Sequence, residues 1–422
     1  MSTAELFGTQ LRRRRESAGL SLRALAEKVH YDPGYVSKVE TNRRNPSHDF
    51  VLRCDAVLGA DGELVAAAGA PAGAAAGVLA GVPDGARGLG AELTLRLRRD
   101  GGAEVDPGDG VPLAALDAGA SVAVLQDPEL AESFAGTLEQ LRVQGQRMPS
   151  GPLLVSVVAQ GQVAYAAALA GPGRRPEYLL LAARFAEYAG WLAQEAGDHT
   201  AALLHTDRAE RLALAAGDDD LVAYVWVRRA EMALYRRDSA QVLDAATEAL
   251  LRPASARVHA LALHRQAQGY ALTGALGRCA DALGRAAELM DTGGRAAAAP
   301  LGSSTVADLQ AATAGWCYHD LGEPDRSAVL LQRAVAGIPA TARRARGLFS
   351  ARLALAHAVD GDFDRASEAG REALAAVRYT RSASTIGELR SLAGELLRHR
   401  RGSPAARQLH LELTDTLHGG AR

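Results

Sequence analysis

The sequence predicts an almost entirely α-helical chain, with a small N-terminal bundle followed by a long series of paired helices. Hydrophobic residues make up 48% of the 422 residues but aromatic residues only 5%, and much of the apolar fraction is alanine, which suits closely packed helices. Apolar side chains recur at helical spacing through the first sixty residues and again from near Pro128 to the end. From Pro176 onward, a pattern of small residues and turns repeats every 37 to 48 residues.

The first seventy residues are expected to form one domain of five short helices. The first helix ends at Gly19, and Ser21 stands where an N-cap of the second helix belongs. Pro33 opens the third helix, because its fixed φ suits the first helical position. A fourth helix is expected to start at Ser47 and a fifth to cover residues 62–68.

Residues 71–90 are expected to be a linker. The stretch VAAAGAPAGAAAGVLAGVP, from Val65 to Pro83, is uncharged and nearly long enough to span a bilayer. Alanine and glycine are only weakly apolar, however, and Pro71 interrupts the run, so a flexible connection fits better than a membrane helix.

Residues 91–175 form an intermediate region that could carry dimer contacts. Leu93, Leu95 and Leu97 alternate with polar residues, and Val122 and Val124 do likewise. This alternation allows a short β-hairpin, although a pair of helices is also compatible with it.

Residues 176–422 repeat a pattern of turns and small side chains. The later turns are anchored at Arg237, Gly274, Gly322, Gly361 and Arg401. Small residues stand seven positions before a turn at Ala230, Ala267, Gly315 and Gly394, and alanines stand twelve positions after it at Ala249, Ala286, Ala334 and Ala373. Small side chains at these offsets let antiparallel helices approach closely, and stacked pairs bury a continuous core. The offsets resemble the tetratricopeptide repeat (TPR), although the units are longer than its 34 residues and lack several of its aromatic positions.

The charge distribution separates the two ends of the chain. Residues 1–53 hold ten basic and six acidic side chains, a net charge of +4, whereas the whole chain has −2. A basic head on an acidic body is expected where one end meets a polyanion. The three cysteines, Cys54, Cys279 and Cys317, fit no disulfide framework or zinc pattern, and no basic segment precedes an apolar core at the N-terminus, so a cytoplasmic location is expected.

The order short helix, tight turn, short helix in Leu22–Glu40 is the helix-turn-helix pattern. The segment GLSLRALAEKVHYDPGYVSKVETNRRNPS resembles the Xre class of 434-repressor and Cro-like regulators in its actinobacterial form, over about residues 5–62. The matching positions are Leu25, Ala26, Val29, Val36, Ser37, Glu40, Arg44 and Pro46. The composition, rich in Ala, Gly and Arg with almost no Lys, also favours a GC-rich bacterial genome.

The resemblance implies residue roles at a double-stranded DNA operator. It implies base contacts from Pro33, Gly34, Ser37 and Lys38. It implies phosphate contacts from Ser21, Leu22, Arg23, Tyr31, Tyr35, Thr41, Asn42, Arg43 and Arg44. Arg15 and Glu40 fall where the family pairs its first and third helices. Pro33 and Gly34 replace side chains that often read bases, so DNA shape is expected to carry part of the specificity. A run of arginines such as Arg12–Arg15 is more often a solvated face, but the helix-turn-helix spacing favours DNA contact.

In a TPR-like pair the first helix lines a concave groove. The groove positions project onto Arg184, Glu187, Trp191, Gln194, Tyr224, Glu231, Tyr235, His264, Gln268, Trp316, His319 and Asp320. Polar groups interleaved with aromatic rings suit an effector pocket, although any one of these aromatic residues could instead fill the helix stack.

The sequence therefore predicts a homodimeric transcription regulator with a possible small-molecule or peptide effector, acting on secondary metabolism or development as the resembling regulators do. No catalytic motif, metal-ligand pattern or cofactor site is found, and Cys317 and His319 point apart on one helix. Two alternatives stay open: a TPR-like scaffold that recruits a protein partner to DNA, and a peptide-pheromone receptor. Such receptors hold their peptide with asparagines, and this chain has none after Asn45.

Overall fold

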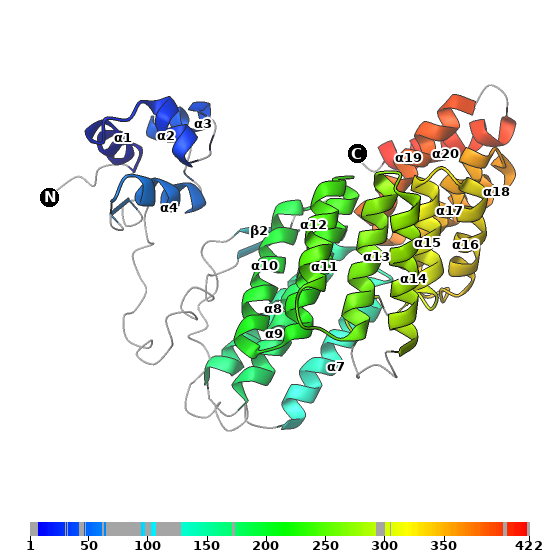
Figure 1. Cartoon of the computed structure of the whole chain (residues 1–422), viewed down its shortest axis with the longest axis horizontal. Coiled ribbons are helices and arrows are strands. Elements are labelled where there is room, and N and C mark those ends of the chain that lie inside the picture. Colours follow the sequence, from blue (N-terminus) through cyan, green and yellow to red (C-terminus); the bar gives the residue numbers. More distant parts are fainter. Residues whose placement is uncertain are drawn as a thin grey trace. The chain divides into compact units, whose positions relative to one another are not determined.

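The computed structural model divides the chain into two compact units, Met1–Pro83 and Asp84–Arg422, which are described separately (Figure 1). The structure describes residues 7–29, 31, 33–41, 46, 48–60, 63–64, 94–97, 103–106, 128–170, 174–292, 300–303, 305–399 and 403–419. The predicted linker, residues 71–90, lies outside these residues, as does part of the predicted intermediate region.

The N-terminal unit is a bundle of short helices around one apolar core. Its helices are α1 (Phe7–Ser17), α2 (Leu22–Val29), α3 (Pro33–Glu40) and α4 (His48–Val57). The core contains Leu11, Leu25, Val36, Phe50 and Leu64, all fully buried. Ser21 caps α2 as predicted, because its Oγ accepts a hydrogen bond from the backbone N–H of Ala24 at 3.1 Å. Of the predicted fifth helix, only residues 63–64 are described, and they are helical.

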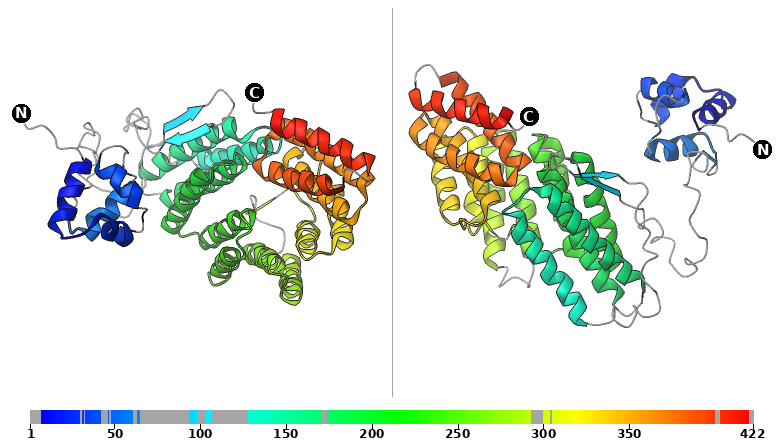
Figure 2. Two further views of the ribbon diagram at one scale, coloured as in Figure 1. Left: turned by 90° about the horizontal axis from the view of Figure 1, so that it is seen from above. Right: turned by 180° about the vertical axis from the view of Figure 1, so that it is seen from behind.

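The second unit is a TPR-like stack of antiparallel helix pairs. It begins with α7 (Pro128–Gly145) and α8 (Ser150–Ala170), which share a core with the first repeat helices. Six pairs follow: α9 (Arg175–Glu195) with α10 (His199–Ala216), α11 (Asp219–Tyr235) with α12 (Ser239–Leu250), α13 (Ala256–Leu272) with α14 (Leu276–Thr292), α15 (Leu309–Asp320) with α16 (Pro324–Ala336), α17 (Arg343–Asp360) with α18 (Phe363–Thr380), and α19 (Ala383–His399) with α20 (Pro404–Gly419). Seen from above, the helix pairs follow a curved path (Figure 2, left).

The predicted turn anchors have left-handed backbones. Gly274, Gly322 and Gly361 have φ of 71°, 79° and 88°, which glycine adopts without a Cβ penalty. Arg237 has a φ of 55° at the equivalent turn. The repeat spacing therefore located a left-handed turn at a residue type that rarely adopts this backbone conformation. The last predicted anchor, Arg401, lies outside the described residues.

Small side chains set the spacing within pairs at some repeats and not at others. A Cβ built on Gly315 would lie 2.7 Å from Leu331 Cγ of α16, so this position admits only glycine without a shift of its neighbour. Ala230 and Ala267 at the same offset are fully buried. A Cβ on Gly394 would meet no atom within 4 Å, so close packing does not explain this fourth small residue.

The intermediate region contains a β-hairpin. Strand β1 (Thr94–Leu97) pairs antiparallel with β2 (Ala103–Asp106), with Thr94 opposite Asp106. The alternating leucines therefore predicted one strand correctly. Its partner in the structure is β2, a segment where we predicted no strand. The strand expected around Val122 and Val124 lies outside the described residues.

One helix in the described part of the chain, Ser150–Leu169 of α8, is long and apolar enough to cross a membrane. In the structure its apolar residues Leu153, Leu154 and Val157 are buried in the core that α8 shares with α9. The uncharged stretch Val65–Pro83 falls entirely outside the described residues.

Candidate functional site

The exposed face of α3 carries the residues expected to read bases. Gly34 and Lys38 are exposed, and Pro33 and Ser37 are half-buried beside them. The opposite face, including Val36 and Val39, is buried in the core. Because these four positions lie on one side of a short helix, the structure presents them together as a single surface.

A buried ion pair fixes α3 against α1. Arg15 Nε donates to Glu40 Oε1 at 2.6 Å, Arg15 Nη2 donates to Glu40 Oε2 at 2.9 Å, and Arg15 Nη1 donates to the carbonyl of Leu20 at 2.9 Å. The hydrogen bond to Glu40 raises the pKa of Arg15. The predicted pairing of Arg15 with Glu40 is confirmed, and both residues serve the architecture.

Ion pairs within the domain neutralise part of the positive charge of the arginine run Arg12–Arg15. Arg12 pairs with Glu16 at 2.9 Å, and Arg14 contacts Glu63. Arg13 is exposed. The run therefore presents much less positive charge than its four arginines indicate.

Exposed cations remain on α2 and α3. Arg23, Lys28 and Lys38 are all exposed. Among the other expected phosphate contacts, Ser21 and Thr41 are exposed and Leu22 is half-buried. Asn42, Arg43 and Arg44 lie outside the described residues.

Tyr31 and Tyr35 belong to an aromatic cluster beneath α3. Their ring centroids lie 5.1 Å apart, and each ring lies 5.0 to 5.1 Å from the ring of Phe50 in α4. Both tyrosines are half-buried. Their rings therefore hold α3 against α4, a packing role that the sequence did not predict.

The interior of the repeat unit is lined by the first helix of every pair. A first cavity of about 180 Å³ lies among α7, α9, α11 and α13, and a second cavity of about 130 Å³ adjoins it toward α15 and α17. Trp191, Glu231 and Arg265 line both cavities. An outer groove of about 820 Å³ follows along α15, α17 and α19.

Most of the projected groove residues line these three spaces. They are Glu187, Trp191, Gln194, Tyr224, Glu231, Tyr235, Gln268, Trp316, His319 and Asp320. His264 does not: it is 2% exposed, and its Nε2 is hydrogen-bonded to Gln310 Oε1 of α15 at 2.7 Å. Burial lowers the pKa of His264 to about 4, so it packs between helices as a neutral ring. Arg184 is half-buried and lines none of the three spaces. The projection was wrong for both residues.

Sequence reasoning missed the arginines of the interior. Arg228 is 1% exposed; its Nη2 donates to Gln194 Oε1 at 2.8 Å, and its Nη1 lies 2.7 Å from Glu231 Oε2. A charged residue inside the apolar stretch VAYVWVRRAEMALY was the available signal, because a buried charge needs a partner.

Arg352 separates the second cavity from the outer groove. Its guanidinium carbon lies 3.0 Å from the ring centroid of Trp316, and its Nε pairs with Glu388 Oε1 at 3.0 Å. Tyr235 lies 5.8 Å from Trp316, ring centroid to ring centroid. The predicted aromatic residues Tyr235 and Trp316 therefore meet around a cation that was not predicted.

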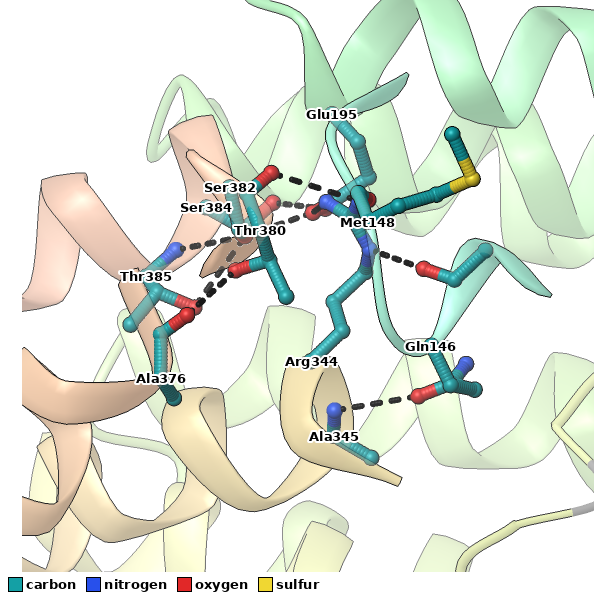
Figure 3. Close-up of polar contacts among 11 residues, drawn as sticks. Gln146, Met148, Glu195, Arg344, Ala345, Ala376, Thr380, Ser382, Ser384 and Thr385 are labelled. Atoms are coloured by element: carbon teal, nitrogen blue, oxygen red, sulfur yellow. Dashed lines mark hydrogen bonds and ion pairs between the residues drawn. The ribbon is translucent and has the colours of Figure 1, made fainter. Parts of the chain in front are cut away.

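A buried network joins the two ends of the helix stack (Figure 3). Arg344, at the start of α17, pairs with Glu195 Oε2 of α9 at 2.8 Å and donates to the carbonyls of Gly145 and Met148, each at 2.7 Å. Ser382 and Ser384 donate to the two oxygens of Glu195, each at 2.5 Å. We call these residues the clasp, because they connect the α7–α8 turn and α9 to α17 and α19 across 149 or more residues of sequence.

The segment before α15 closes one side of the first cavity. Arg142 of α7 donates to the carbonyls of Pro300 and Gly302 at 3.2 and 2.6 Å. Arg257 of α13 donates to the carbonyl of Leu301 at 2.9 Å. Gly302 thereby becomes a wall of the cavity.

The fold and these surfaces define a two-part architecture, a helix-turn-helix domain joined to a TPR-like repeat unit. A family model described as a helix-turn-helix domain matches residues 6–68. A comparison with curated proteins gave no match. Among solved structures, the chain is similar to a Rap protein complexed with competence and sporulation factor, at 14% identity and a TM-score of 0.40, over 69% of this chain and 88% of that one. A likeness of that size says nothing about what this chain binds.

Proposed function

We propose that the chain is a sequence-specific DNA-binding transcription regulator. The observation that carries the proposal is the exposed face of α3, where Lys38 and Gly34 stand on the second helix of a helix-turn-helix domain. Such a helix enters the major groove, and a lysine there donates to guanine O6 or N7. The chain would act in the cytoplasm as a homodimer on paired half-sites, and, as in the regulators it resembles, on genes of secondary metabolism or development.

Binding to DNA duplexes selected from a random pool tests this role. Lys38→Ala should weaken binding by about 1–3 kcal/mol and relax the preference at one position, because it removes a base contact. Arg23→Ala should weaken binding to all sequences alike and make the salt dependence shallower, because it removes a phosphate contact.

Lys28→Ala is the matched control, since Lys28 is the other lysine of the chain and is also exposed, at the end of α2. If Lys28→Ala and Lys38→Ala lose equal affinity, Lys38 contributes only charge. If the full chain selects no sequence, the DNA-binding role is wrong.

We further propose that the repeat unit controls DNA binding by taking up an effector in its interior. The cavities combine aromatic walls with buried polar groups, as ligand sites do. A bound effector should raise the thermal stability of the chain, by about 3 kcal/mol at a hundredfold excess over its Kd. Trp191→Ala should remove that shift, whereas Trp226→Ala should not, because Trp226 lies outside the cavities and packs between Arg229 and Arg252.

A second candidate function is the recruitment of a protein partner to DNA. The outer groove supports it, because at about 820 Å³ it is much larger than the inner cavities. Arg390 and Arg398 extend it along α19. Co-purification of a defined protein that Arg390→Glu abolishes, with no stabilisation by small molecules, would favour this function over effector control.

A further inference from the structure

The first cavity contains buried hydrogen-bond donors that the protein leaves without acceptors. Among the described residues that line this cavity, Arg228 Nε and Arg265 Nε are buried with no hydrogen-bond partner. Both atoms are N–H donors of guanidinium groups. Leaving such groups unsatisfied is costly, so the site lacks acceptors in particular.

The nearby carboxylates leave these two Nε donors open. Glu231 Oε2 forms an ion pair with Arg228 through Nη1 at 2.7 Å, whereas Glu187 Oε1 lies 3.6 Å from Arg228 Nε, beyond hydrogen-bond distance. Burial raises the pKa of Glu187 more than the neighbouring arginines lower it. Burial also pushes the pKa of Glu231 upward, but there Arg228 and Arg265 outweigh it, so the net direction is downward. Three arginines (Arg142, Arg228 and Arg265) and three acids (Glu139, Glu187 and Glu231) line the cavity, so the arginines outnumber the charged acids when Glu187 is protonated.

The remaining wall is aromatic and apolar. Tyr188 and Trp191 stack with ring centroids 5.5 Å apart and planes 14° apart. Tyr224, Leu261 and Leu309 continue this surface. The volume of about 180 Å³ suits a body of one ring, since an engineered cavity of about 150 Å³ binds benzene.

We propose that the first cavity binds a small organic carboxylate with an aromatic or apolar body, with its anion on the donors of Arg228 and Arg265 and its body against Trp191 and Tyr224. A carboxylate fits these donors better than a neutral carbonyl, because it carries the charge opposite to the guanidinium and has two acceptor oxygens. The proposal deepens the effector-controlled role above and rests on it, but its test requires no DNA.

Calorimetric titration of the full chain with phenylacetate and with phenylacetamide tests the proposal. The two probes share one body and differ in the charge of the acceptor. We expect phenylacetate to bind at least about tenfold more tightly than the amide. The arginine variant Arg265→Gln should abolish this preference, whereas Arg278→Gln should keep it, because Arg278 is an exposed arginine on α14 over Tyr270.

Three results would overturn the proposal. Equal affinity for acid and amide would mean that the donors do not select an anion. Unchanged phenylacetate binding in Arg265→Gln would place the ligand elsewhere. Absence of heat and of thermal stabilisation with either probe at about 20 mM would mean that water alone fills the cavity. The comparison of the two probes uses the unaltered chain, so it tests the proposal even if a variant misfolds. If the probes bind as expected but no DNA sequence is selected, only the regulatory role fails.

Discussion

Replacing Glu195 by alanine should weaken the repeat unit more than any change at an exposed acid. Glu195 is 4% exposed and accepts hydrogen bonds from Arg344 and from the hydroxyls of Ser382 and Ser384. The substitution leaves a guanidinium and two hydroxyls in the protein interior without this acceptor.

The expected loss in free energy of unfolding depends on the hydrogen bonds that each buried group keeps after the substitution. Breaking one side of a buried ion pair costs about 3–5 kcal/mol. Arg344 keeps the carbonyls of Gly145 and Met148, so we expect the lower end, about 3 kcal/mol. Glu195→Gln keeps one acceptor oxygen and replaces the other by an NH₂ donor, so its cost should be smaller than that of alanine, about 1–2 kcal/mol.

Urea unfolding followed by tryptophan fluorescence measures the effect on this unit alone, because Trp191, Trp226 and Trp316 all belong to it. A loss of about 3 kcal/mol lowers the urea midpoint by roughly 1 M at an m-value of about 3 kcal/mol/M. Glu177→Ala, on the same helix but in an exposed pair with Arg174, should cost no more than about 0.5–1 kcal/mol. Equal midpoints for the Glu195 and Glu177 variants would refute the reasoning.

Three further predictions concern single positions. Gly315→Ala should destabilise the repeat unit by about 1–3 kcal/mol, because its Cβ would overlap Leu331. Gly394→Ala at the same repeat offset should be neutral or stabilising by up to about 1 kcal/mol. Urea midpoints compare the two variants, and equal losses of stability would contradict the packing argument. Since His264 has a folded pKa of about 4, below its unfolded value, its contribution to stability is complete above about pH 6.5 and falls by about 1.4 kcal/mol per pH unit on acidification toward pH 4. Between pH 6.5 and 5 the urea-derived stability of His264→Gln should therefore fall by about 2 kcal/mol less than that of the unaltered chain, and an identical pH dependence would show that the ring titrates normally. Ser21→Ala removes the cap of α2 and should lower the stability of the helix-turn-helix unit by about 1 kcal/mol, measured by circular dichroism on the isolated unit, while Ser21→Thr should restore most of it.

Much of the fold could be predicted because its signals are local. The cap at Ser21 and the turns at Gly274 and Gly361 depend on residues within a few positions of one another. Arg237 was identified by spacing alone, since the repeat imposes its left-handed turn on a residue that does not favour it. The pairing of Arg15 with Glu40 could be predicted only from the family resemblance, because no local sequence pattern links the two residues.

The interior of the repeat unit could be predicted only in part. Helical periodicity shows which face of a helix is buried, but not which distant helix covers that face. Glu195 therefore reads as an ordinary acid at a helix end, although Arg344 meets it from 149 residues away. His264 was misplaced for a related reason: the projection gave every first helix the same inward face, whereas His264 of α13 is covered by Gln310 of α15.

The clasp changes how the helix stack should fold and respond to truncation. A solenoid usually behaves as a one-dimensional series in which each repeat stabilises only its neighbours, so end repeats fray or can be removed at little cost to the rest. Here the turn after α7 and the end of α9 are fastened to α17 and to the start of α19, which gives the unit contacts of very high sequence separation. Such contacts slow folding but make it more cooperative. Removing the chain from α17 onward should therefore also destabilise the helices around the first cavity, because the whole unit should fold and unfold in one cooperative step.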